Sequence, residues 1–168
     1  MDATNIETKQ YLTFRLAGET FAVNVAKVRE ILDFISITKV PRTPDFMRGV
    51  INLRGSVVPV VDMKLKFGME ITEKTVNTCI IVLEVDLEEE SIIVGALADS
   101  VQEVLELESA DIEPPPRIGM KLNIDFISGM GRRGDEFVII LDTDRIFTFE
   151  EAEALGEIGE IDAATGTD

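Results

Sequence analysis

Alternation of apolar and polar residues dominates the chain and predicts short β-strands. Leu12, Phe14 and Leu16 occupy alternate positions before a turn at Gly18, and the alternation resumes at Phe21. This period of two on both sides of a glycine turn predicts an antiparallel hairpin with one buried face. Further strands are predicted at residues 29–38, 49–53, 57–62, 76–85, 91–97, 101–107, 127–131 and 136–142. Helix is expected only in short segments, so the predicted fold class is all-β, mostly strand with a few short helices.

An internal repeat divides the chain into two similar halves. Six short segments recur in the same order, with an offset that drifts from 73 to 80 residues. The pairs are Val28–Leu32 with Val101–Leu105, Pro41-Arg42 with Pro116-Arg117, Phe46–Gly49 with Phe126–Gly129, Arg54-Gly55 with Arg133-Gly134, Val58–Asp62 with Val138–Asp142, and Phe67 with Phe147. This order predicts the duplication of one five-stranded unit. Because short strands leave exposed edges unless the sheet closes, we expect two tandem SH3- or OB-like small barrels, packed with an apolar groove between them.

The repeat also sets the expected domain boundaries. Residues 1–9 are predicted to be an N-terminal tail, 10–75 a first barrel subdomain and 76–148 a second one. Residues 149–168 are predicted to form a short helix followed by an acidic disordered tail, because they hold seven acids, no bases and three glycines. The pattern leaves open whether the two subdomains exchange strands.

Charge is distributed unevenly along the chain. The formal net charge is −16; residues 1–75 carry 11 basic and 9 acidic side chains, whereas residues 76–168 carry 5 and 23. Such an acidic surface repels phosphate backbones, so the sequence predicts no binding of nucleic acid. Solubility is one explanation for the excess of acids. The functional alternative is electrostatic steering of this protein towards a partner with a basic patch.

The sequence predicts a cytoplasmic location without membrane insertion. The longest apolar run is Ile92 to Ala98, seven residues, whereas a membrane span needs about 20. Residues 1–10 lack the apolar core of a signal peptide. The single Cys79 has no partner for an internal disulfide, which fits a reducing compartment.

The residue types argue against catalysis and predict no cofactor and no metal. The chain has no histidine, the commonest general base and metal ligand. Cys79 lies in a buried-strand pattern, where a free cysteine is a small apolar residue. Asp62 and Asp142 stand at equivalent repeat positions where a strand meets a short helix, which predicts helix N-caps. A carboxylate-based hydrolase, with two acids facing each other across a pocket, is the remaining enzymatic alternative.

Three segments resemble one family. Val23–Ile31, Pro44–Gly55 and Val58–Asp62 are similar to CheW-type chemotaxis coupling proteins, and the resemblance covers roughly residues 10–150. It implies a non-enzymatic adaptor that ties the cytoplasmic tips of chemoreceptors, the methyl-accepting chemotaxis proteins, to the regulatory domain of the histidine kinase CheA. That regulatory domain is itself CheW-like, so pairing between barrels and assembly into rings are also implied, with recruitment to membrane-associated receptor arrays.

The resemblance further implies a receptor-binding site in the groove between the barrels. The matching positions are Val28, Glu30, Ile31, Gly49, Arg54, Leu97, Val101 and Val104. An apolar groove can receive the apolar stripe of a helical receptor tip. The family pattern pairs Arg54 with Glu30; if that pair is partly buried, loss of either partner leaves an unpaired charge at a cost of about 3–5 kcal/mol. Core packing is the alternative for the apolar positions, and a solvated side chain for Arg54. The resemblance assigns no kinase-binding residues.

A second class of function is a small-barrel module that binds oligonucleotides or oligosaccharides, as many small barrels do. The acidic charge and the absence of tryptophan argue against it, because such sites rely on basic grooves and aromatic stacking.

Overall fold

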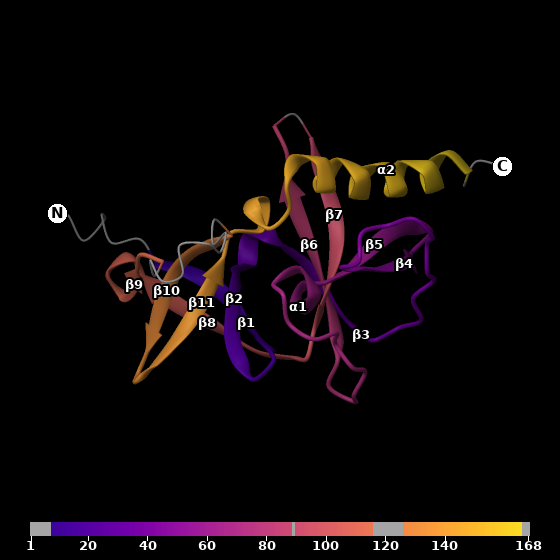
Figure 1. Cartoon of the computed structure of the whole chain (residues 1–168). Helices are drawn as coiled ribbons and strands as arrows, with labels where there is room; N and C mark the ends of the chain where they lie inside the picture. Colours follow the sequence, from indigo (N-terminus) through magenta and orange to yellow (C-terminus); the bar gives the residue numbers. More distant parts are fainter. Residues whose placement is uncertain (1–7, 89, 116–125, 166–168) are drawn as a thin grey trace.

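The computed structural model describes residues 8–88, 90–115 and 126–165. It confirms the all-β prediction, with two packed sheets and few helices (Figure 1). The strands are β1 Thr8–Leu16, β2 Glu19–Asn24, β3 Val28–Asp33, β4 Met47–Leu53, β5 Ser56–Asp62, β6 Cys79–Asp86, β7 Ser91–Ala98, β8 Ser100–Glu108, β9 Ile112–Glu113, β10 Ile127–Arg133 and β11 Glu136–Leu141. The helices are α1 Met63–Lys66 and α2 Phe149–Thr165, with 3₁₀ turns at Val25–Lys27, Ser109–Asp111 and Thr143–Arg145.

Each sheet curls until its two ends meet. One has the strand order β8-β1-β2-β11-β10-β9, and its terminal strands β8 and β9 are joined directly by the 3₁₀ turn Ser109–Asp111. The other has the order β3-β6-β7-β5-β4, and the chain leaving β3 reaches β4, where Thr38 and Val50 exchange backbone hydrogen bonds of 2.9 and 2.8 Å. We call them the six-stranded and the five-stranded barrel.

The barrels are not assembled from the contiguous ranges 10–75 and 76–148. Hairpin β1–β2 lies in the six-stranded barrel with β8 to β11, while hairpin β6–β7 lies in the five-stranded barrel with β3 to β5. The two halves therefore exchange their hairpins. The duplication remains visible, because β5 pairs in parallel with β7 just as β11 pairs in parallel with β2.

The exchanged hairpins form the layer between the barrels. The largest apolar cluster contains Phe14 and Phe21 from one barrel together with Ile81 and Val94 from the other. Two smaller clusters fill the barrel interiors. Strands β6 and β7 contribute alternate side chains to the shared layer and to their own interior, so both of their faces are buried. This explains the uninterrupted apolar run in β7, because only strands with one solvated face need polar residues at alternate positions.

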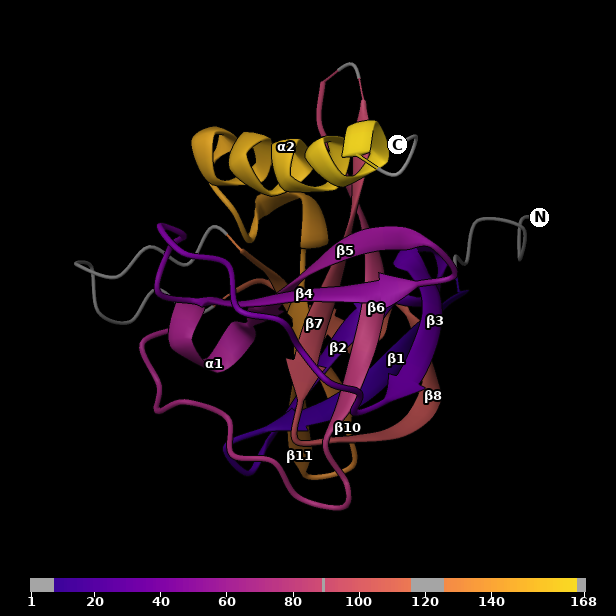
Figure 2. The same cartoon turned by 90° about the vertical axis from the view of Figure 1, so that its right-hand side faces the viewer.

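The chain ends differ from the expected boundaries. Residues 1–7 of the predicted tail lie outside the described residues, and β1 already begins at Thr8. Helix α2 continues past Gly156, where the disordered tail was expected, and it crosses over the five-stranded barrel (Figure 2). Its continuation has a packing reason: Ala152 and Leu155 are buried, and Ile158 packs against the same apolar layer.

The start of α2 is fixed by polar contacts. Thr148 and Glu151 form a reciprocal capping box, with backbone-to-side-chain distances of 2.9 and 3.1 Å. Lys66 of α1 adds an ion pair of 2.7 Å to Glu151. Burial raises the pKa of Glu151, but the hydrogen bonds from Lys66 and Thr148 outweigh it and leave this pKa below its ordinary value.

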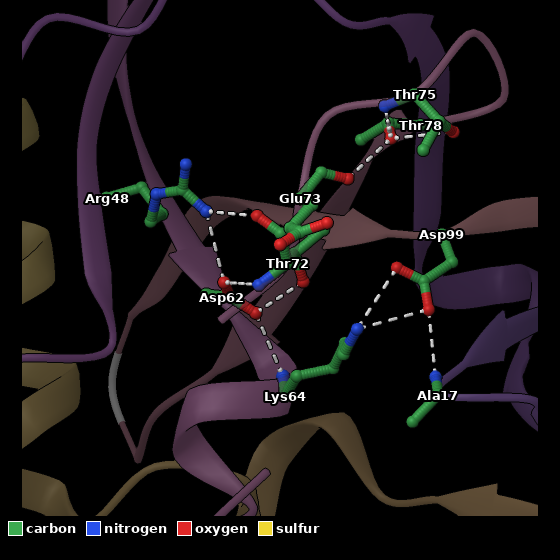
Figure 3. Close-up of polar contacts among 9 residues, drawn as sticks. All are labelled: Ala17, Arg48, Asp62, Lys64, Thr72, Glu73, Thr75, Thr78 and Asp99. Carbon is green, nitrogen blue, oxygen red and sulfur yellow. Dashed lines mark hydrogen bonds and ion pairs between the residues drawn. The ribbon is translucent and has the colours of Figure 1, made fainter. Parts of the chain in front are cut away.

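Asp62 anchors the turn between β5 and α1 from a fully buried position. Its carboxylate accepts hydrogen bonds from the Lys64 amide at 3.1 Å, from the Thr72 amide and hydroxyl at 2.8 Å each, and from Arg48 Nη1 at 3.1 Å (Figure 3). The predicted N-cap is therefore confirmed, and the same carboxylate also holds the chain after α1. Asp142 caps the equivalent 3₁₀ turn through the Asp144 amide at 3.0 Å.

Replacing Asp62 by alanine should cost far more stability than replacing its repeat counterpart. Asp62→Ala removes the acceptor of four donors and leaves Arg48 without its buried counter-charge, so the free energy of unfolding should fall by about 3–5 kcal/mol. Asp142→Ala removes a cap whose side chain is 35% exposed, at about 0.5–2 kcal/mol. Urea unfolding of both variants measures the difference; equal losses would contradict the role given to the buried network.

Gly49 should be irreplaceable at the point where the five-stranded barrel closes. Its φ is +143°, and a Cβ there would stand 2.1 Å from the Thr38 carbonyl oxygen. Gly55 is the matched control, because its φ is +87° and nothing lies within 4 Å of the corresponding position. Gly55→Ala should cost about 1–2 kcal/mol of backbone strain, and Gly49→Ala about 1–3 kcal/mol more. Denaturant unfolding would refute the closure argument if the two variants were equally stable.

Candidate functional site

Two crossover strands carry most of the predicted site. Strand β3 leads from the six-stranded into the five-stranded barrel, and β8 leads back the other way. Val28 and Val101, near the starts of these strands, are partly buried and pack against the shared apolar layer. Ile31 and Val104, three residues further on, are 44% and 51% exposed. The margin of the layer thus offers apolar side chains to solvent at equivalent positions of the repeat.

Cys79 lies opposite the far end of β3. It pairs with Asp33 across β3 and β6, and its side chain is buried. Burial is the main reason that the pKa of Cys79 lies above its ordinary value, and the nearby Asp33 carboxylate adds to the effect. The thiol is therefore protonated at neutral pH, which agrees with the small apolar role expected for it.

Arg54 forms a two-pronged ion pair with Glu30. Its Nη1 and Nη2 donate to the two carboxylate oxygens at 2.7 and 2.9 Å, from a turn where Arg54 has a φ of +52°. The hydrogen bonds lower the pKa of Glu30 and raise that of Arg54. The pairing expected from the resemblance is thus present. The Arg54 side chain is 73% exposed, whereas the Glu30 carboxylate that its loss would leave unpaired is 27% exposed, so the pair is partly buried on the Glu30 side only.

The same pair borders a cavity. The cavity has a volume of about 540 Å³ and lies between the β4–β5 turn, β3, the start of β7 and α2. Its wall combines the polar Arg29, Glu30 and Arg54 with the apolar Ile92 and Leu155. Sequence reasoning missed Leu155 as a wall residue, because the segment following it was expected to be disordered.

Two predicted site residues lie in the interior. Leu97 is fully buried in the core of the five-stranded barrel, and Gly49 is buried against Thr38. Neither can touch a partner directly in this structure. Core packing, the alternative reading, therefore holds for Leu97, while Gly49 lies against the backbone of Thr38. Val28, Glu30, Ile31, Arg54, Val101 and Val104 remain at least partly accessible.

The repeat counterpart of the Arg54 pair is weaker. Arg133 contacts Glu103 through one bond of 3.3 Å, and the carboxylate side chain is 63% exposed. The two halves thus place a similar ion pair at equivalent turns but with different geometry.

The structure also bears on metal binding and on paired acids. Within the described ranges, no group of three or more potential metal ligands comes together. Asp62 is fully buried and satisfied by its donors, while Asp142 borders a different cavity on the other barrel. These two acids, which stand at equivalent repeat positions, therefore do not share a cavity. No helix in the described part of the chain is long and apolar enough to cross a membrane.

Comparison with known proteins places the chain in a family. The model of the CheW-like domain matches residues 10–151. The chemotaxis protein CheW of Klebsiella aerogenes is 31% identical over 152 residues, which cover 90% of this chain and 89% of that protein. The chemotaxis protein CheW of Rhizobium meliloti is 36% identical over 146 residues, covering 87% and 92%. The scaffolding protein TtCheW from Thermoanaerobacter tengcongensis superposes with a TM-score of 0.75 at 32% identity, over 86% of this chain and 96% of that one.

These matches extend over both barrels and confirm the resemblance that the three sequence segments carry. The family consists of scaffolds that catalyse no reaction, so the non-enzymatic prediction is confirmed by membership. The chain belongs to the CheW family of chemotaxis scaffold proteins.

Proposed function

We propose that this chain is a cytoplasmic coupling protein that binds the tips of chemoreceptors and the regulatory domain of CheA, and thereby brings the kinase under receptor control in membrane-associated arrays. The observation that carries the proposal is the exposed apolar margin of the crossover strands, beside the Glu30–Arg54 pair. A helical receptor tip with an apolar stripe matches such a surface.

The exposed aliphatic side chains supply the binding energy in this proposal. Ile31 and Val104 are exposed on β3 and β8, while Val28 and Val101 are partly buried and pack against the apolar layer. Covering an aliphatic side chain that is already half-buried yields part of the roughly 1.5–3 kcal/mol available from full burial. Several such contacts are enough for a reversible complex of the kind that signalling requires.

The Glu30–Arg54 pair orients the partner. Its two parallel hydrogen bonds hold the guanidinium plane in place at the edge of the apolar surface. A charged group at the rim of an interface affects specificity and association more than it affects folding. The kinase domain, being CheW-like by family, is expected to dock barrel to barrel on another face, and members of the family can extend such contacts into rings.

Arg54→Glu should weaken receptor binding while the protein stays folded. The variant places a carboxylate against Glu30 at the rim, and an ion pair whose arginine is 73% exposed contributes little to stability. Co-sedimentation with a receptor signalling fragment should show at least a tenfold loss of affinity. Arg132→Glu is the matched control, because Arg132 is 62% exposed and also paired, with Glu113 on the six-stranded barrel. Unchanged binding by folded Arg54→Glu would remove Arg54 from the site.

Coupling itself is tested with three components. Kinase activity of CheA should rise only when the receptor fragment, CheA and this chain are all present. Ile31→Asp, which puts a charge on the exposed apolar margin, should abolish the rise without lowering the unfolding midpoint. If activation persists without this chain, or with Ile31→Asp, the proposed coupling surface is wrong.

A further inference from the structure

A second cavity, on the five-stranded barrel, is lined by three cations. It has a volume of about 370 Å³, and its charged wall residues are Lys39, Arg48 and Lys74. Phe34 and Ile37 form the apolar part of the wall. Within the part of the chain that the structure describes, no carboxylate lines it. Such a concentration of positive charge is unexpected on a chain of net charge −16.

Arg48 is held in the wall of this cavity by two hydrogen bonds. Its Nη1 donates to the buried Asp62 carboxylate and to the Thr72 carbonyl oxygen, each at 3.1 Å. Figure 3 shows the other terminal nitrogen directed away from Asp62. Asp62 pairs with Arg48, and its three further donors from Lys64 and Thr72 are neutral, so the unpaired positive charge of the wall comes from the two lysines. A guanidinium anchored on one side keeps donors available on the other.

The two lysines complete the positive wall. No ion pair joins Lys39 or Lys74 to a carboxylate among the described residues, and the ammonium of Lys74 rests 4.9 Å from the centre of the Phe34 ring. The two unpaired lysine charges on one cavity wall repel each other, and this repulsion is relieved when an anion enters. The cavity is therefore complementary to negative charge, in contrast to the overall charge of the chain.

We propose that this cavity binds glutamate or aspartate side chains of an acidic segment of a partner protein. The shape of the wall favours a carboxylate on a hydrocarbon stem, because Phe34 and Ile37 can pack against the stem while the cations meet the head group. The proposal is independent of the receptor surface, since the cavity shares no lining residue with the one beside Arg54.

The probe is a capped hexapeptide of three Glu-Ala repeats, titrated into the full-length protein and followed by amide chemical shifts. We expect shifts at residues 34–39 and 48, at millimolar or lower peptide concentration, and none with a Gln-Ala peptide of the same length. The double variant Lys39→Ala/Lys74→Ala should weaken binding at least tenfold. Arg48 is left unchanged, because its removal would unpair Asp62.

The matched control is Lys9→Ala/Arg15→Ala, which removes two exposed positive charges from β1 of the other barrel. This variant should bind the peptide within twofold of the unchanged protein. Equal loss in both double variants would show that only net charge matters and would overturn the proposal. Chemical-shift changes that map to other residues would also overturn the proposal. So would inorganic phosphate binding as tightly as the peptide, because the cavity would then bind anions without preference for a carboxylate side chain.

Discussion

The packing of two hairpins against each other is the interaction on which the rest of this structure depends. Hairpins β1–β2 and β6–β7 meet through their apolar faces, and each also closes the barrel of the opposite half. Neither barrel can lose its hairpin without opening its sheet, and the shared layer cannot form unless both hairpins are in place. Each lobe therefore depends on the other for its packing, although the chain encodes two copies of one motif.

The exchange of hairpins also creates the candidate site. Because each hairpin sits in the other half's barrel, β3 and β8 must cross from lobe to lobe, and they do so at the edge of the apolar layer. A crossing strand cannot be covered on both sides by its own barrel. Ile31 and Val104 are consequently exposed beside buried neighbours. The exposed apolar side chains at the edge of the layer thus follow from the topology. No separate groove is needed to make them accessible.

The sequence predicted the local elements well because alternation is a local property of strands with one solvated face. It could not reveal the exchange, since hairpin β1–β2 buries the same face whichever half supplies its neighbours. Leu97 was misplaced for a related reason: both faces of β7 are buried, so alternation does not distinguish the interior from a partner surface. The pairing of Arg54 with Glu30 came from the family resemblance, whereas its exposure could come only from coordinates. Lys39 and Lys74 lie far apart in sequence, and barrel closure brings them together.

Divergence between the two copies is what gives the molecule two different faces. Asp62 is buried and binds Arg48, whereas its counterpart Asp142 is partly exposed and binds Arg145 of its own turn. Arg54 donates two hydrogen bonds to Glu30, whereas Arg133 donates one to Glu103. In each case the backbone position is equivalent and the charge environment is not. A duplicated fold with identical copies would offer each partner two competing sites. In the proposed coupling function, unequal copies on one shared layer let different partners bind in a fixed relative orientation, which is the physical requirement for a scaffold that couples them.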